Sequence, residues 1–244
     1  MDERINNYYK FCQRRIRDIK PKQTALIVID MQKYQVQKEY TVFKAMNNIT
    51  PGILDYFVRE VENKVTPNLR KLIDFCHEVG IPVIYTKFSS FMPDGSDLSK
   101  NAKRTNELTK KLWGEETYPY ISHHSSDIID DLIPEDRDFV IQKNTSGTFM
   151  STRLDSFLRN MDIETVLITG VVTNFCVSAT ASEAVDYGFQ VVIVEDCCAA
   201  WSPEIHDATL KSFGLLKGYI LTHQKVIKKI SRMMRKIKDE IAIH

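Results

Sequence analysis

The sequence predicts an α/β fold with three layers, αβα, around a mostly parallel six-stranded sheet of the Rossmann-like kind. Two observations predict it. Short apolar runs alternate with stretches of helical periodicity along most of the 244 residues. These runs are hydrophobic at successive positions, as in Ala25–Ile29, which is typical of strands covered on both faces. No linker or repeat interrupts the chain, so we expect a single domain over residues 1–244.

The first half of the chain combines regular elements with two long irregular segments. A charged amphipathic helix is expected over residues 1–20. Residues 31–62 and 88–120 are expected to be long irregular segments. The second of these contains a turn at 93–95 and a polar helical stretch. Strands are expected at Thr24–Ile29, Val83–Thr86 and Asp138–Gln142, and helices at Val65–Val79, ended by Gly80, and at Ser126–Leu132.

The second half alternates regularly. Helices are expected at Ser151–Asn160, Cys176–Tyr187 and Pro203–Phe213, and strands at Thr165–Thr169, Gln190–Val194 and Tyr219–Leu221. Ser202 followed by Pro203 is a typical helix start. A basic amphipathic helix over residues 223–244 ends the chain. We expect it to pack on the body or on another subunit rather than to bind a membrane or nucleic acid.

Composition excludes several classes of function. The net charge of +1 gives no electrostatic reason to expect nucleic acid as a partner. No apolar run approaches the roughly 20 residues that span a bilayer, and the charged N-terminus lacks a signal-peptide core. The five cysteines form no pattern of spaced pairs, which predicts a reducing, cytoplasmic location. The scattered glycines predict no nucleotide cofactor, and His123-His124 is read as a surface pair rather than as a metal site.

Chemically useful side chains follow several of the expected strands. Asp30 ends the first apolar run, Lys143 follows Phe139–Ile141, and Gly170 to Cys176 follows Thr165–Thr169. Ligands bind outside the carboxyl ends of the strands in such sheets, so these groups are expected to meet there. Cys176 would lie at a strand-to-helix turn, where unpaired N–H groups should make its thiol easier to ionise.

An acid, an amine and a thiol in one place would support acyl transfer. Asp30 could take the thiol proton, Lys143 could stabilise the charged groups, and backbone N–H groups before Cys176 could hold an oxyanion. The residues alone leave another interpretation open. In that interpretation Cys176 is a small buried hydrophobe, Asp30 caps a loop and Lys143 is a solvated surface charge.

Three segments resemble the isochorismatase-like cysteine hydrolases, in the order found in that family and over roughly residues 22–222. They are the opening strand Thr24–Gln32, the lysine segment with Lys143, Phe149, Thr152 and Leu154, and the nucleophile segment Gly170–Val177 with Thr180 and Ala181. Glu195-Asp196 with Ala199-Ala200 is similar to the strand end that follows. One departure is Lys33-Tyr34-Gln35, where an Asn-Asp-Phe type of segment is common in the family.

The resemblance implies a catalytic triad of Asp30, Lys143 and Cys176. It also implies a cis peptide at Val171–Val172 and an oxyanion site formed by the N–H groups of Val172 and Cys176. It further implies a small-molecule substrate, with Gln32, Phe149, Asn174 and Phe175 as candidate contacts, and a homo-oligomer, either a dimer or a tetramer. Of the aromatic residues that could line the site (Tyr34, Phe88, Trp113, Tyr118, Phe149 and Phe175), only Phe175 adjoins the nucleophile in sequence.

Residue types within the family favour one chemistry. Cys176 is present, which favours hydrolysis of a C–N bond in a small amide or ureido compound through a thioester. No histidine follows the second strand, which disfavours the metal-dependent nicotinamidases and favours a metal-independent enzyme. The N-terminal helix, the Thr173-Asn174 pair and the segment Ser126–Leu132 resemble those of ureidoacrylate, biuret and N-carbamoyl amidohydrolases. Two alternatives stay open: a vinyl-ether hydrolase of the isochorismatase type, and a non-catalytic interaction protein of the same fold.

Overall fold

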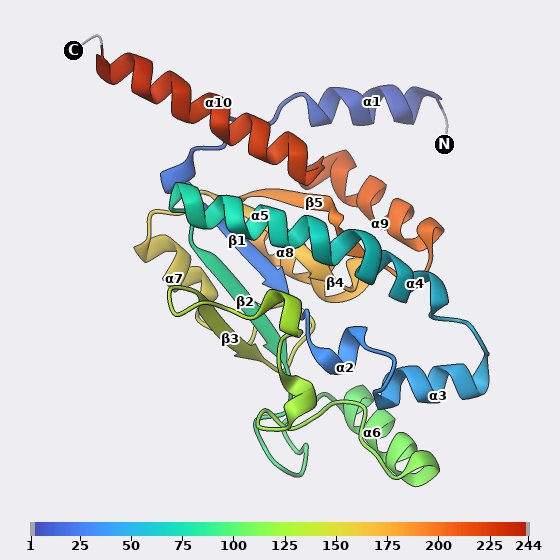
Figure 1. Ribbon diagram of the computed structural model, residues 1–244. Coiled ribbons are helices and arrows are strands. Elements are labelled where there is room, and N and C mark those ends of the chain that lie inside the picture. Colours follow the sequence, from blue (N-terminus) through green and yellow to red (C-terminus); the bar gives the residue numbers. More distant parts are fainter. Residues whose placement is uncertain (1–2, 243–244) are drawn as a thin grey trace.

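The computed structural model describes residues 3–242 and confirms the expected three-layer α/β architecture (Figure 1). A six-stranded sheet has the order β3-β2-β1-β4-β5-β6, and every neighbouring pair is parallel. The strands are β1 (Thr24–Ile29), β2 (Val83–Phe88), β3 (Phe139–Lys143), β4 (Thr165–Val171), β5 (Gln190–Ala199) and β6 (Tyr219–Leu221). The helices are α1 (Glu3–Gln13), α2 (Lys33–Val36), α3 (Thr41–Ile49), α4 (Asp55–Glu60), α5 (Thr66–Val79), α6 (Lys100–Trp113), α7 (Leu154–Asn160), α8 (Ser178–Asp186), α9 (Pro203–Leu216) and α10 (His223–Ala242).

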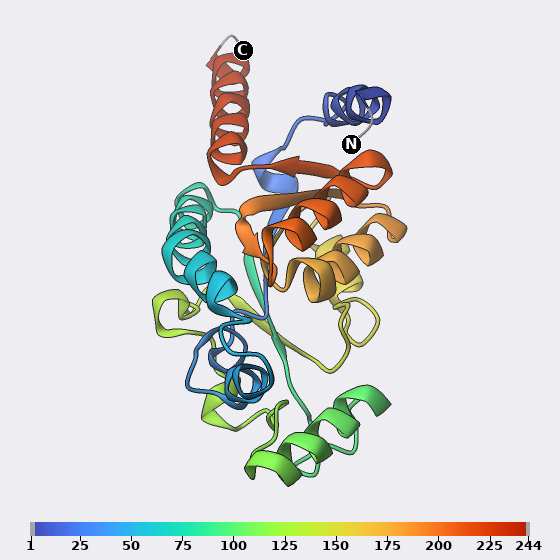
Figure 2. The ribbon, with the colours of Figure 1, turned by 90° about the vertical axis from the view of Figure 1, so that its right-hand side faces the viewer.

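Two hydrophobic cores cover the two faces of the sheet, and Figure 2 shows the helical layers on either side of it. Strand β1 is buried at every position, and its side chains alternate between the cores. Leu26 and Val28 pack with residues of α5 and α10, whereas Ala25, Ile27 and Ile29 pack with residues of α7, α8 and α9. This two-sided burial explains why the strands read as continuous apolar runs.

The carboxyl ends of the strands point towards α2, α3 and α6, which lie together beyond that edge of the sheet (Figure 1). Glycine allows β1 and β4 to approach closely there. Gly170 has φ of 99°, and a Cβ on it would overlap the backbone of Ile29 in β1. The ends of β1 and β4 are therefore held next to each other, and each leads directly into a candidate site residue.

The segment 31–62 contains helices that the sequence reading missed. Helices α2 and α3 start without any side-chain cap, so the usual signal of a helix start is absent. Packing stabilises this segment instead, because Val36, Phe43, Leu54 and Phe57 are all buried in one core. The expectation of an irregular segment was wrong for this reason.

Other boundaries also differ from expectation: α7 starts at Leu154 rather than Ser151, β2 continues to Phe88 and α9 to Leu216. Three differences are larger. The predicted helix over 126–132 is wrong. Ile128 forms an antiparallel β-bridge with Gln32, and the Ile129 amide donates to the Met31 carbonyl at 3.0 Å. These contacts hold the segment extended between two short 3-10 turns. Strand β5 continues to Ala199, so Glu195 and Asp196 lie inside the strand and not after it. Helix α1 ends at Gln13 rather than near residue 20.

Helix α10 packs on the body through its first half, as expected for a terminal helix. Val226 and Ile230 are buried in the same core as α5, whereas the lysines and arginines of the opposite face are exposed. Residues 243–244, which the sequence reading included in this helix, lie outside the described residues. Along residues 3–242 no helix combines the length and the apolar character needed to cross a membrane.

Candidate active site

Asp30 follows β1 and is fully buried, with φ of 50° at this position. Thr86, the partner of Ile29 on the neighbouring strand β2, holds it in two ways. The Thr86 hydroxyl donates to Asp30 Oδ1 at 2.6 Å, and the Asp30 amide donates to the Thr86 carbonyl at 3.2 Å. One carboxylate oxygen is thus fixed by a hydrogen bond, and the other faces the site.

Lys143 is the last residue of β3 and is also fully buried. Its Nζ lies 2.7 Å from Asp30 Oδ2 and donates to the carbonyls of Thr145 and Ser146, each at 3.1 Å. Burial lowers the pKa of Lys143, but the nearby Asp30 and Cys176 outweigh it, so the pKa is raised and the ammonium form is retained. A carboxylate and an ammonium therefore form an ion pair that is sealed from solvent.

Cys176 lies in a π-helical turn, Thr173–Val177, between β4 and α8, and its thiol contacts both Asp30 and Lys143. Burial raises the pKa of this thiol to about 12; Asp30 adds to the increase and Lys143 opposes it. The expectation that the turn makes the thiol easier to ionise is therefore wrong for the resting site. The influence of a helix start is smaller here than desolvation and the adjacent carboxylate.

The turn that carries Cys176 begins at an unusual backbone feature. The Val171–Val172 peptide is cis, and the Val172 carbonyl accepts hydrogen bonds from the amides of Phe175 at 2.9 Å and Val177 at 3.4 Å. Thr173 is buried beneath the turn and its hydroxyl is 2.9 Å from His206 Nδ1 on α9. His206 therefore links α9 to this turn.

The four candidate substrate contacts lie in different environments. Gln32 is buried, and its amide is occupied: Nε2 donates to the carbonyls of Phe88 and Ser126, and Oε1 accepts from the Phe88 amide at 2.7 Å. Phe149 lies in a core, stacked on Tyr187 with centroids 5.1 Å apart. Asn174 is half-buried and Phe175 is 55% exposed. Gln32 and Phe149 therefore support the fold around the site, whereas Asn174 and Phe175 are the accessible pair.

An aromatic group that the sequence reading did not select lies beside the ion pair. Lys143 Nζ is 5.2 Å from the centroid of the Phe88 ring, and Phe88 contacts Tyr118 edge-on at 5.4 Å. Tyr34 meets Tyr118 at 6.5 Å. Phe88 ends β2, but Tyr34 and Tyr118 come from segments without regular periodicity in the sequence, and no local pattern favours them over Phe175.

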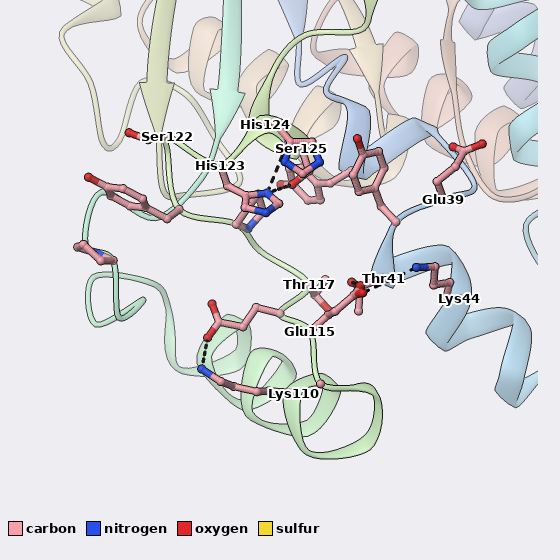
Figure 3. Close-up of a pocket in the computed structure, with 17 residues that line it drawn as sticks. Glu39, Thr41, Lys44, Lys110, Glu115, Thr117, Ser122, His123, His124 and Ser125 are labelled. Carbon is pink, nitrogen blue, oxygen red and sulfur yellow. Dashed lines mark hydrogen bonds and ion pairs between the residues drawn. The ribbon is translucent and has the colours of Figure 1, made fainter.

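A cleft of about 880 Å³ lies next to this aromatic group, between α3, α6 and residues 115–125 (Figure 3). Tyr34 lines it, and His123 and His124, which are both exposed as expected for a surface pair, lie on its wall. Their rings are 4.4 Å apart, and His123 Nδ1 is 2.7 Å from the Ser125 hydroxyl.

One group of metal-capable side chains is found among residues 3–242: the ligand atoms of Asp196, Cys197 and His223 lie within 4.8 Å of one another. Hydrogen bonds within the protein already occupy this carboxylate. Asp196 Oδ1 accepts from the His223 amide at 2.8 Å, and Oδ2 is 2.7 Å from His223 Nδ1. The cluster therefore anchors the start of α10.

Comparison with known proteins decides the family. Residues 24–225 match the isochorismatase domain. The chain belongs to this family. The match spans the strands from β1 to β6 and includes Asp30, Lys143 and Cys176.

Relatives of this isochorismatase-family chain include enzymes of several names. The ureidoacrylate amidohydrolase RutB of Acinetobacter baylyi is 29% identical over 222 residues, which cover 85% of this chain and 83% of that protein. Nicotinamidase 3 of Arabidopsis thaliana is 26% identical, with 87% and 91% covered. Among solved structures, a cysteine hydrolase from Pseudomonas syringae superposes with a TM-score of 0.74 at 23% identity, over 89% of this chain and 97% of that one. The N-carbamoylsarcosine amidase of Thermoplasma acidophilum has a TM-score of 0.58 at 25% identity, with 82% and 96% covered.

Proposed function

We propose that this isochorismatase-family hydrolase is a metal-independent cysteine amidohydrolase that cleaves a C–N bond of a small amide or ureido compound. One observation carries the proposal: a solvent-free Asp30–Lys143 ion pair at 2.7 Å in contact with the thiol of Cys176. The named relatives include amidohydrolases that act on ureido and amide compounds, which supports this substrate class.

The ion pair would make a protonated thiol usable as a nucleophile. Asp30 Oδ2 has no hydrogen bond of regular geometry, which leaves this oxygen able to accept a proton. As the sulfur attacks the substrate carbonyl, the thiol proton moves to Asp30, and the C=O π electrons move onto oxygen. The amides of Val172 and Cys176 would hold that oxyanion. Lys143 stabilises the negative charge that remains around the sulfur and the carboxylate.

The second half of the reaction uses the same groups in reverse. Asp30 returns its proton to the leaving nitrogen, the C–N bond breaks, and an amine or ammonia departs from a thioester on Cys176. Asp30 then takes a proton from water, whose oxygen attacks the thioester carbonyl. The acid is released, and the proton returns to the sulfur.

Ammonia release tests the proposal on ureido acids, biuret, carbamoyl amino acids and nicotinamide. Cys176→Ala should lower kcat/KM by about 10³-fold or more, because removal of a covalent nucleophile removes the route itself. Cys197→Ala, which removes a buried thiol outside the site, is the control and should stay within twofold of wild type. Ammonia release that survives Cys176→Ala would contradict the covalent route, and no turnover of any amide would favour a vinyl-ether hydrolase or a non-catalytic protein.

We also propose a cellular location and an oligomeric state for the protein. The described cysteines are all free, which supports a cytoplasmic location. Helix α1 exposes Ile5, Tyr8 and Phe11 on one side of the molecule, which supports a homo-oligomer such as a dimer or a tetramer. No acidic or nucleic-acid partner is needed for the proposed chemistry.

A further inference from the structure

Tyr118 lies in a segment that separates the cleft from the candidate active site. Its sequence neighbours Thr117 and Pro119 both line the cleft, whereas Tyr118 does not. The Tyr118 ring instead packs against Phe88 at 5.4 Å and Tyr34 at 6.5 Å, and Phe88 in turn lies under the ammonium of Lys143. Burial raises the pKa of Tyr118, and the Cys176 thiol adds to the increase, which agrees with a position close to the sulfur.

The backbone of Tyr118 is held by a single buried side chain. Asn106 on α6 accepts a hydrogen bond from the Tyr118 amide at 2.8 Å and donates one to the Tyr118 carbonyl at 3.0 Å. Asn106 is 7% exposed, and helix α6 has a regular start at Ser99 and a regular end at Gly114. Both polar atoms of one amide are thus used to fix one residue.

The two tyrosines of the aromatic group differ in what their hydroxyls do. The Tyr34 hydroxyl donates to the Phe88 carbonyl and accepts from Gln35 Nε2, both at 3.1 Å, so its capacity is used. The Tyr118 hydroxyl has no hydrogen-bond partner within the part of the chain that the structure describes. A partly buried phenol without a partner, beside a nucleophile, is suited to bind a polar group of a ligand.

We propose that Tyr118 is a substrate-contacting, specificity-determining residue, and that Asn106 is its positioning residue. The inference rests on the proposed amidohydrolase function and adds a substrate class: a planar amide or ureido compound that carries a second polar group beyond the scissile bond. The planar part packs against the rings of Phe88 and Tyr34. The second polar group takes a hydrogen bond from the Tyr118 hydroxyl.

A pair of ureas of similar size tests this inference. N-carbamoylglycine carries a carboxylate where propylurea carries an ethyl group. Tyr118→Phe should lower kcat/KM about tenfold for N-carbamoylglycine, which corresponds to the loss of one hydrogen bond, and should stay within twofold for propylurea. Asn106→Ala should give the same selective loss, because it releases Tyr118. Tyr120→Phe, on the cleft side of the same segment, and Asn101→Ala, exposed on α6, should change neither value.

Protection of Cys176 against iodoacetamide measures binding without turnover. The concentration of N-carbamoylglycine that halves alkylation should rise about tenfold in Tyr118→Phe, and that of propylurea should not change. If ammonia release fails but this selective loss of protection is found, the proposed function is wrong and the binding inference stands. Equal losses for both ureas, no loss for either, or no protection of the wild type would overturn the inference.

Discussion

Two clusters in this molecule each combine a thiol, a carboxylate and a nitrogen-bearing side chain, yet their groups are used differently. In the first, Asp30, Lys143 and Cys176 converge from β1, β3 and the turn after β4. In the second, Asp196 and Cys197 on β5 lie beside His223 at the start of α10. Both hold an aspartate and a cysteine, and the nitrogen group is a lysine in the first and a histidine in the second.

The difference lies in what each carboxylate is free to do. Both oxygens of Asp196 are occupied by His223, through its amide and its ring. Asp30 has one oxygen fixed by Thr86 and the other paired with an ammonium whose remaining hydrogen bonds go to backbone carbonyls. Burial raises the pKa of both thiols, but Lys143 opposes the increase at Cys176. A cation and an available lone pair, rather than the thiol itself, distinguish the proposed reaction centre.

Removal of the cation should give the largest difference between the clusters. Lys143→Met leaves the buried Asp30 carboxylate without its partner, and we expect the free energy of unfolding to fall by about 3–5 kcal/mol. The double variant Asp30→Asn with Lys143→Met should recover most of this loss and remain inactive. Urea unfolding followed by circular dichroism measures both. Urea unfolding resolves differences in the free energy of unfolding of about 1 kcal/mol. A smaller difference between Lys143→Met and wild type would contradict a sealed ion pair.

The pH dependence of alkylation should show an intermediate effect. Burial and Asp30 raise the pKa of Cys176 to about 12, and Lys143 lowers it. The thiolate is the reactive form, so at pH values below this pKa a lower pKa means faster alkylation. Asp30→Asn should therefore speed the reaction of Cys176 with iodoacetamide, and Lys143→Met should slow it. Each change should be roughly tenfold per unit of pKa.

Peptide mass spectrometry can follow Cys176 and Cys197 in the same samples between about pH 7 and pH 10. Cys197 serves as the internal reference, because neither substitution changes its surroundings. The order Asp30→Asn, wild type, Lys143→Met in decreasing rate is the expected result. The reverse order would mean that the ammonium and the carboxylate do not control this thiol.

The second cluster should give the smallest effect, limited to stability. Asp196→Asn weakens the hydrogen bonds that anchor α10, and we expect a loss of about 1 kcal/mol, as for a helix cap. Amide exchange over 223–226 should quicken, while kcat/KM stays within twofold of wild type. A tenfold loss of activity in Asp196→Asn would remove the distinction between the clusters.

Much of the first cluster could be predicted from the sequence, because its parts follow directly from regular strands. Asp30 and Lys143 end apolar runs, and parallel strands bring their carboxyl ends to one edge. The protonation state of Cys176 could not be predicted in this way. It depends on desolvation by segments distant in sequence, which local patterns do not report.

Local sequence patterns also could not predict the segments that surround the site. Helices α2 and α3 start without a side-chain cap. Strand β5 continues through the polar pair Glu195-Asp196, because Cys198 and Ala199 still pair with β4 after a shift in register. Tyr118 reaches the site through two hydrogen bonds from a helix twelve residues earlier in the chain. Tertiary packing decided each of these features.

Asn106 and Tyr118 both belong to the chain between β2 and β3, whereas Asp30 and Cys176 are fixed by β1 and β4, which touch through Gly170. Exchanges in residues 89–125 can therefore alter which molecule is recognised while leaving the contacts that hold Asp30 and Cys176, whereas Ser126 and Ile129 hold Gln32 and Met31 in the segment after Asp30. Evolution and protein engineering alike can vary selectivity and chemistry independently in this architecture, and libraries aimed at new substrates are best confined to that interval.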